Sequence, residues 1–179
     1  LLGKIAALTH QLEFPVIAKS VGSGISVSTA RRLLEAGVAA IDVAGAGGTS
    51  WARVEGRRSE DPRRLALAES FAGWGVPTAE LTRRLRAAFA QTPLIASGGV
   101  RSGVDIARAL ALGANLAGIG LPLLEPATRS AAAVAEHLFL LVDGLRIAMF
   151  ASGCTQTRDL RYALDSRGSD ETEIVDPST

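Results

Sequence analysis

Four short apolar runs recur along the chain, each ending in small or polar residues. They lie at residues 15–19, 40–43, 93–97 and 117–120. Successive positions in each run are apolar, so both faces of each segment must be covered, as in a parallel sheet flanked by helices. The pattern predicts four parallel strands in an α/β fold.

Helical spacing of apolar residues occurs between and after these runs. Four helices are expected. The first begins at a Ser28–Thr29 cap and ends at Gly37, and the second begins at Thr78 and runs through Phe89. The third begins at Ser102 or Asp105 and ends at Gly113, and the fourth runs from about residue 127 to 150. Two strand, glycine loop and helix units share one frame, which predicts right-handed βαβ winding into a barrel or a doubly wound layer. Four such units would be half of a TIM (β/α)8 barrel.

One connection between predicted strands, residues 44–77, is unusually long and begins with a glycine-rich stretch. A short helix is expected at 65–71. Loops of this length inside compact domains are usually lids or binding segments. The remainder reads as a single domain over 1–179, with a polar, flexible tail at roughly 162–179.

Composition narrows the class of protein. The formal net charge of the 179 residues is +1, which argues against a nucleic-acid or anionic-membrane partner. Charged residues interrupt the longest apolar stretch, at 131–150, so it does not predict a membrane span. The single cysteine, Cys154, excludes a disulfide framework and indicates a cytoplasmic protein. Because the chain begins at Leu1 rather than Met, we expect a piece of a longer polypeptide.

Two glycine turns are candidates for anion binding. Residues 97–103 follow a predicted strand and open a helix, where unpaired N–H groups and the helix dipole favour a phosphate. The next strand ends in a second such turn, and paired loops of this kind hold phosphate in many barrel enzymes. The alternative is ordinary tight turns. The predicted phosphate residues are Gly98, Gly99, Val100, Arg101, Gly120 and Leu121.

Lys19 ends an otherwise apolar strand, so its charge must reach either solvent or a ligand. At the carboxyl end of a barrel strand the ligand is favoured, and the ammonium could stabilise an anionic flavin or another developing negative charge. Asp42 also lies on a strand, but the pattern does not determine on which face of the sheet its side chain lies. A structural role for Asp42, accepting from loop N–H groups, fits at least as well.

Trp51 and Glu55 are four residues apart, so one helical turn would bring both to one face. A tryptophan in a glycine-rich loop suggests stacking on a planar ligand, and Glu55 could act at a proton-exchanging centre. Equally, Trp51 could fill a barrel rim while Glu55 pairs with Arg53 or Arg58.

Other chemistries lack support in the sequence. His10 and His137 lie in helical patterns as surface or satisfied residues, away from strand ends. There is no G-x-S-x-G motif, and Cys154 follows the last long helix, which disfavours nucleophilic catalysis. No His, Cys or Asp cluster has metal-ligand spacing, so no metal site is predicted.

Several segments, in order, resemble type 2 isopentenyl-diphosphate isomerase up to about Arg161. The most distinctive is residues 40–52, which contains Gly-Gly-Thr-Ser-Trp at 47–51; the others are residues 15–26, 74–78, 97–101 and 109–114. The resemblance implies an FMN-bound barrel that interconverts isopentenyl and dimethylallyl diphosphate. In that family reduced flavin acts as an acid and base, NADPH or another reductant primes it, and Mg²⁺ neutralises the substrate diphosphate.

The same resemblance assigns roles to individual residues. Lys19 and Thr49 would contact FMN, the two glycine turns would surround its phosphate, and Trp51 and Glu55 would lie at the flavin and substrate face. Ser20 and Ala44 depart from the family pattern, which has Glu and Gly there.

The larger departure is length, because the family's first four strands and its metal site have no counterpart here. The expectation is a homo-oligomeric C-terminal half that keeps the flavin-phosphate site and is inactive alone. Two rivals remain. One is another FMN barrel, although a 2-hydroxyacid oxidase would need His and Arg, and an IMP-dehydrogenase-like protein a Cys, in the loop after Val43. The other is a non-catalytic half-barrel that binds phosphate or FMN.

Overall fold

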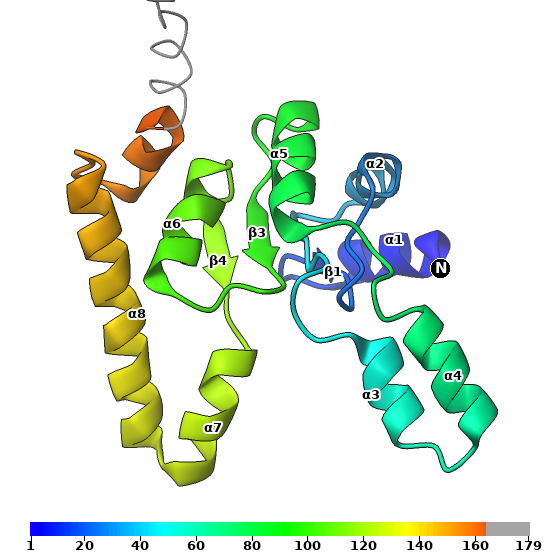
Figure 1. Cartoon of the computed structure of the whole chain (residues 1–179). Helices are drawn as coiled ribbons and strands as arrows, with labels where there is room; N and C mark the ends of the chain where they lie inside the picture. The colour runs from blue at the N-terminus through cyan, green and yellow to red at the C-terminus, as the bar shows by residue number, and fades with distance from the viewer. Residues whose placement is uncertain (164–179) are drawn as a thin grey trace, which may run out of the picture.

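The computed structural model describes residues 1–163, and in this part of the chain four strands form one parallel sheet (Figure 1). The strands are β1 (Ile17–Lys19), β2 (Ala40–Asp42), β3 (Leu94–Ser97) and β4 (Leu116–Gly118), and they pair in chain order. The predicted parallel α/β fold is confirmed. A doubly wound sheet reverses its strand order at a switch point, and the described strands show no reversal, an order that favours winding toward a barrel.

The strand register places polar side chains together on one face of the sheet. Lys19 is the partner of Asp42, and Ser97 is the partner of Gly118. Because side chains alternate along a strand, Ile41 and Leu94 point to the opposite face, where both are fully buried. One face is therefore an apolar core, and the other carries the polar groups.

Helices α2 (Val27–Glu35), α5 (Thr78–Ala88) and α6 (Gly103–Ala111) cover the apolar face. The main cluster joins strand residues to helix residues: Ile41, Val43, Leu94, Leu33, Leu81 and Leu85. Burial of large aliphatic side chains contributes about 1.5–3 kcal/mol each, so this cluster is the main source of the fold's stability.

Helix starts follow the capping residues. Ser26, not the predicted Ser28–Thr29 pair, caps α2 by accepting the N–H of Thr29 at 3.2 Å. The expected start of α5 at Thr78 is confirmed. Ser102 caps α6, and Asp105 returns the interaction.

The long helix expected at about 127–150 is present, but it begins at Ala131, four residues later than predicted. The structure has α7 (Leu121–Arg129) and α8 (Ala131–Ala151), separated at Ser130, whose backbone is extended. The Ser130 side chain accepts the N–H of Ala133 at 3.1 Å and so begins α8. Two further elements are α1 (Leu2–Gln11) and a 3₁₀ turn, η1 (Thr157–Asp159). No helix within residues 1–163 is long and apolar enough to cross a membrane.

The long connection folds into two helices, α3 (Trp51–Arg57) and α4 (Pro62–Ser70). The start of α4 precedes the predicted residue 65, because Asp61 caps the helix and Pro62 occupies its first turn. The two helices pack closely at Gly56, where a Cβ atom would lie 2.3 Å from that of Ala68. Helices α3, α4 and α7 extend from the edge where the strand arrows end (Figure 1).

The expected flexible tail, 162–179, lies outside the described residues from 164 onward. His137 is half-buried, and its Nε2 atom has no hydrogen-bond partner among the described residues, so the expectation of a surface or satisfied histidine is wrong.

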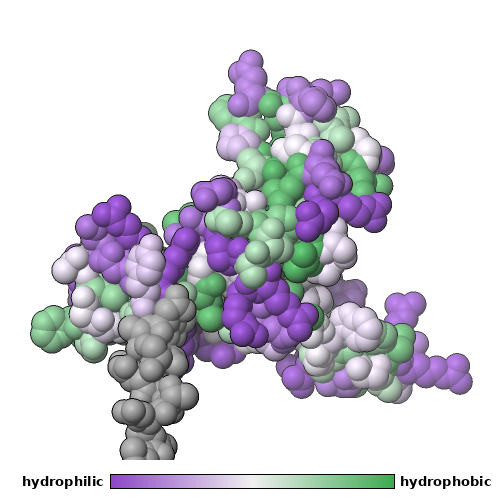
Figure 2. Space-filling model, turned by 90° about the horizontal axis from the view of Figure 1, so that it is seen from above, coloured by the Kyte–Doolittle hydropathy of each residue, from purple (hydrophilic) through white to green (hydrophobic). Residues whose placement is uncertain are grey.

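Apolar side chains are also exposed in the described part of the molecule. Ile17 on β1 and Leu116 on β4 are 51% and 61% exposed, on the face that carries Lys19. Seen from above, hydrophobic surface lies between hydrophilic side chains (Figure 2). The second face of this sheet therefore lacks the cover that helices give the first.

Candidate functional site

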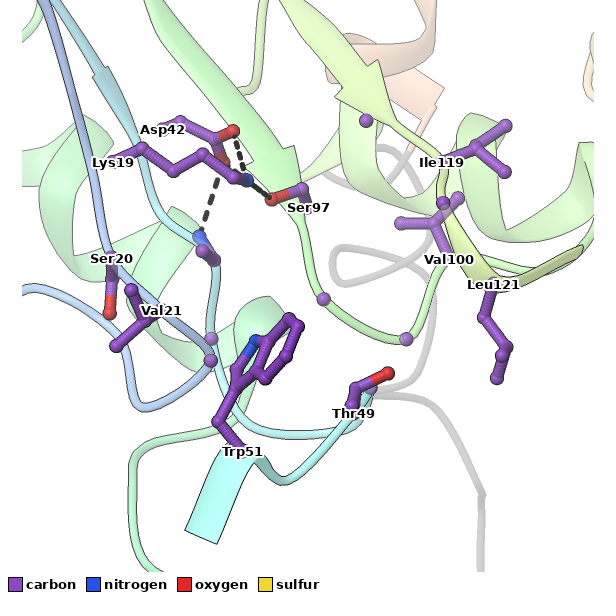
Figure 3. Close-up of a pocket in the computed structure, with 18 of the residues that line it drawn as sticks. Lys19, Ser20, Val21, Asp42, Thr49, Trp51, Ser97, Val100, Ile119 and Leu121 are labelled. Atoms are coloured by element: carbon purple, nitrogen blue, oxygen red, sulfur yellow. Dashed lines mark hydrogen bonds and ion pairs between the residues drawn. The ribbon is translucent and has the colours of Figure 1, made fainter. Parts of the chain in front are cut away.

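A pocket of about 660 Å³ lies at the carboxyl ends of the four strands (Figure 3). The segments that line it follow each strand in turn, at residues 19–22, 42–51, 97–101 and 118–121. This is the edge at which barrel enzymes place their active sites. The fold thus gathers loops that are distant in sequence around one cavity.

The structure brings together nine of the ten residues that sequence singled out for the site. These pocket-lining residues are Lys19, Thr49, Trp51, Gly98, Gly99, Val100, Arg101, Gly120 and Leu121. Glu55 is not among the residues that line the pocket. Its side chain is 78% exposed and pairs with Arg58 at 3.5 Å, one of the two partners that the alternative interpretation named.

Glycines allow the loops after β2 and β3 to touch. Gly98 and Gly99 have φ angles of +99° and +85°. A Cβ atom on Gly99 would lie 2.6 Å from the carbonyl oxygen of Gly47, so a side chain at this position would separate the loops. The Arg101 guanidinium donates to the same Gly47 oxygen at 2.9 Å. Backbone contact and one arginine thereby fix this wall of the pocket.

Unpaired N–H groups line the same cavity from two sides. Within residues 1–163, the backbone N–H groups of Gly99, Val100, Gly120 and Leu121 donate no hydrogen bond. The first two belong to the turn after β3, and the others begin α7 after β4. Such groups, together with a helix N-terminus, are suited to an anion such as the phosphate of FMN.

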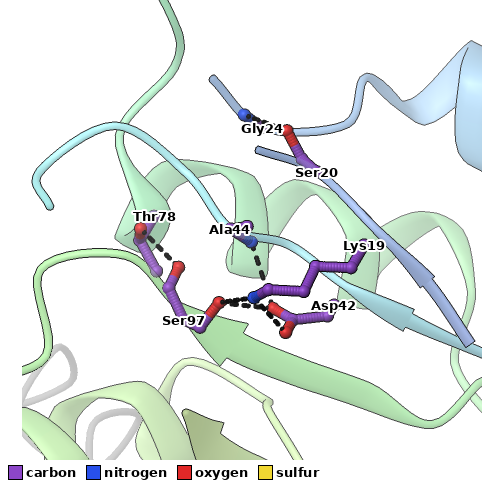
Figure 4. A network of polar contacts seen from close by, with 7 residues as sticks. All are labelled: Lys19, Ser20, Gly24, Asp42, Ala44, Thr78 and Ser97. Atoms are coloured by element: carbon purple, nitrogen blue, oxygen red, sulfur yellow. Dashed lines mark hydrogen bonds and ion pairs between the residues drawn. The ribbon is translucent and has the colours of Figure 1, made fainter. Parts of the chain in front are cut away.

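Lys19, Asp42 and Ser97 form a polar network at the base of the pocket (Figure 4). The ammonium of Lys19 donates to Asp42 Oδ2 at 2.6 Å and to Ser97 Oγ at 2.9 Å. Ser97 Oγ donates to Asp42 Oδ1 at 2.6 Å, and the backbone N–H of Ala44 donates to the same oxygen at 3.2 Å. Asp42 therefore accepts both from Lys19 and from a loop N–H group. Ser97 was not singled out by sequence, because a serine at a strand end gives no signal of its contacts.

Trp51 occupies the first position of α3, and Ser50 caps that helix. The side chain is directed toward the pocket in Figure 3 and is 59% exposed. A second, smaller cavity of about 200 Å³ lies beside it, lined also by Phe71 and Trp74. The indole thus forms a wall between two hollows, and a planar ligand could stack on it.

The two departures from the family pattern have visible consequences. Ala44 has a φ of +38°, and it is the one non-glycine residue with positive φ among the described residues. Glycine adopts this conformation without the cost that a Cβ atom imposes. Ser20 accepts the N–H of Gly24 at 3.0 Å and so shapes the loop after β1.

No group of three or more His, Cys, Asp or Glu side chains that could hold a metal occurs in the part of the chain that the structure describes. The charged residues that line the pocket are instead Lys19, Asp42 and Arg101, of which the first two pair with each other.

The chain is similar to curated proteins named isopentenyl-diphosphate delta-isomerase. The isopentenyl-diphosphate delta-isomerase of Stutzerimonas stutzeri is 52% identical over 162 residues, which cover 90% of this chain and 47% of the relative. That of Cronobacter sakazakii is 47% identical over 170 residues, or 95% and 49% of the two chains. This chain therefore spans about half the length of the curated relatives it matches.

Among solved structures, mandelate oxidase superposes with a TM-score of 0.68 at 24% identity, covering 90% of this chain and 42% of the oxidase. That likeness concerns the fold alone. The sequence also matches the FMN-dependent dehydrogenase family over residues 2–166. On this match, which includes every segment around the pocket, the chain belongs to the FMN-dependent dehydrogenase family.

Proposed function

We propose that this chain is the FMN-binding, C-terminal half of a type 2 isopentenyl-diphosphate delta-isomerase. The observation that carries the proposal is the pocket at the strand ends, which gathers Lys19, Trp51 and two glycine turns with unpaired N–H groups. Relatives that are about half identical, and twice as long, bear the isomerase name.

The chain's own residues would divide the work of binding. The N–H groups of the two glycine turns hold the FMN phosphate, and Arg101 braces the loop beside them. Lys19 donates to the flavin from the base of the pocket, while Thr49 and Trp51 close its side. In a type 2 isomerase, reduced FMN would supply acid and base chemistry. Glu55 is proposed to act in proton transfer at the substrate face.

We also propose that a second half-barrel completes the enzyme. Four strands are half of a (β/α)8 barrel, and the exposed Ile17 and Leu116 lie on the face that a complete barrel would enclose. In this proposal the Mg²⁺ site and the residues that bind the substrate diphosphate belong to that other half, NADPH is a reductant of the complete enzyme, and the chain alone is inactive. The proposed compartment is the cytoplasm.

A second function within the same family is FMN-dependent oxidation. It is disfavoured by the loop after Val43, which reads Ala-Gly-Ala-Gly-Gly-Thr-Ser-Trp and lacks the His and Arg of a hydroxyacid oxidase. A half-barrel that binds FMN without catalysis differs from the proposal only in what happens when the other half is added.

Two measurements separate the isomerase from the non-catalytic half-barrel. The purified chain is titrated with FMN and followed by flavin fluorescence, and uptake at one FMN per chain is expected. The chain is then mixed with a protein that consists of the N-terminal half of the Stutzerimonas stutzeri relative. Isopentenyl diphosphate is supplied to the mixture with reductant and Mg²⁺. Formation of dimethylallyl diphosphate supports the isomerase. FMN uptake without turnover in the mixture favours the non-catalytic half-barrel, and no FMN uptake removes both.

A further inference from the structure

The ammonium of Lys19 has three N–H bonds, and the structure accounts for two of them. One points to Asp42 Oδ2 at 2.6 Å and another to Ser97 Oγ at 2.9 Å. Both acceptors lie on neighbouring strands, so they hold the ammonium from the sheet side (Figure 4). The third N–H bond has no acceptor among the described residues, and Lys19 lines the pocket, so a bound ligand could supply that acceptor.

The direction of each hydrogen bond in this network is determined. An ionised carboxylate can only accept, so Ser97 must use its single hydrogen to donate to Asp42 Oδ1 at 2.6 Å. The Ser97 oxygen is then left to accept from Lys19. The Ala44 N–H group, which donates to Asp42 Oδ1 at 3.2 Å, is the third donor to this carboxylate. No alternative arrangement of these hydrogens satisfies all four groups.

Burial makes the support rigid while the lysine remains accessible. Asp42 and Ser97 are each 7% exposed, whereas the Lys19 side chain is 57% exposed. An unrestrained lysine of that exposure would sample many rotamers, and a ligand would have to bear the cost of ordering it. Two buried acceptors impose that order before any ligand arrives.

We propose that Asp42 and Ser97 are positioning residues that fix Lys19, so that it presents one directed N–H bond to a hydrogen-bond acceptor of the bound ligand. The ammonium charge is largely balanced by Asp42, so direction is the principal contribution of Lys19. The identity of that ligand as FMN rests on the proposed function, but the fixed ammonium does not.

The fixed ammonium can be observed without any ligand. The chain has two lysines, Lys4 and Lys19, and Lys4 is exposed on α1. Protein labelled with ¹⁵N-lysine should therefore give two side-chain Nζ signals. The Nζ protons of Lys19 should exchange slowly with water, and those of Lys4 quickly. Asp42→Asn and Ser97→Ala should each speed the exchange at Lys19 and leave Lys4 unchanged. Equally fast exchange at both lysines in the wild-type chain would overturn the proposal.

A double-mutant cycle on FMN affinity tests what the fixed ammonium does. Asp42→Asn should weaken FMN binding about tenfold, the size expected for a hydrogen bond to a charged group. In a Lys19→Met background the same change should have no effect on affinity, because Asp42 acts through Lys19. Equal losses in both backgrounds would make Asp42 a structural residue only and would refute the positioning role.

Ser97→Ala provides a second cycle should Asp42→Asn fail to fold, because it removes one hydroxyl and no charge.

The outcomes also separate the two proposals. Slow Lys19 exchange in a chain that takes up no FMN keeps the fixed ammonium and rejects FMN as its ligand. FMN uptake with fast Lys19 exchange keeps the proposed function and rejects the positioning role.

Discussion

Lys19 reaches the pocket with more than half of its side chain exposed, and its remaining N–H bond is available to a ligand. Lys19→Ala should therefore weaken FMN binding by about 1.5–3 kcal/mol, as expected when a hydrogen bond to a charged group is lost. An FMN titration followed by fluorescence measures this change. Lys4→Ala is the matched control, and unchanged affinity in Lys19→Ala would remove Lys19 from the FMN site.

Glu55 poses a different question, because the structure places it outside the pocket and beside Arg58. If Glu55 serves proton transfer in the complete enzyme, Glu55→Gln should abolish isomerisation and retain bound flavin. Arg58→Gln breaks the same ion pair and should keep turnover. Normal turnover in Glu55→Gln would limit Glu55 to an exposed ion pair, a kind that contributes little to stability.

Ala44 carries a backbone strain that glycine would relieve. The left-handed conformation of Ala44 costs an L-residue about 1–2 kcal/mol. Glycine avoids that cost, but it lowers stability by up to about 1 kcal/mol because it raises the conformational entropy of the unfolded chain. Ala44→Gly should therefore raise the free energy of unfolding slightly, by up to about 1 kcal/mol in a urea titration. Ala36→Gly, at a φ of −79°, should lower it. A loss of stability in Ala44→Gly equal to that control would contradict the strain argument.

At the scale of elements, the start of α6 fixes the turn that lines the pocket. Burial tends to raise the pKa of Asp105, but hydrogen bonds from the Ser102 hydroxyl and from the N–H groups of Arg101 and Ser102, with Arg108 nearby, outweigh it and lower that pKa. A carboxyl with a lowered pKa stabilises the fold above its unfolded pKa, near 3.8, and this contribution is lost as the pH falls through the folded value.

Two variants test this capping interaction. Asp105→Asn should reduce stability at neutral pH by about 1 kcal/mol, typical of a lost helix cap, and the difference from wild type should shrink below pH 4. Urea unfolding at several pH values measures it, with Asp143→Asn on the exposed face of α8 as the control. A constant difference across pH would show that the charge of Asp105 does not stabilise α6.

Elements signalled by adjacent residues were predictable from the sequence. Apolar runs located the strands, and the glycines at 98 and 99 located the turn after β3. The break at Ser130 was not, because alanines continue the helical pattern on its far side and only the extended backbone there reveals the cap. The partnership of Ser97 with Asp42 spans 55 positions, and no local pattern encodes such a contact.

The candidate site, too, was predictable from the sequence only in part. Main-chain N–H groups at strand ends follow from the βα repeat, so the glycine turns could be located before the structure. The orientation of α3 depends on how α4 packs against it, including the Arg53–Glu69 contact at 3.2 Å. That packing directs Trp51 to the pocket and Glu55 to solvent, a distinction that their four-residue spacing could not supply.

At the scale of the molecule, the sheet has one covered face and one open face. Edge strands β1 and β4 leave backbone groups available for pairing, and Ile17 and Leu116 lie exposed beside them. Such edges and apolar side chains promote association with another chain. Burial of each side chain in an interface would contribute about 1.5–3 kcal/mol at most.

The purified chain should therefore associate with itself, and light scattering should show a mass that rises with concentration above that of one chain. Ile17→Ser combined with Leu116→Ser should lower that mass at equal concentration, because it removes apolar surface from the open face alone. Phe150→Ser is the control, since Phe150 is 88% exposed but lies near the end of α8. If Phe150→Ser lowers the mass equally, association depends on general hydrophobicity, and a wild-type chain that stays monomeric would show that the open face needs no protein partner.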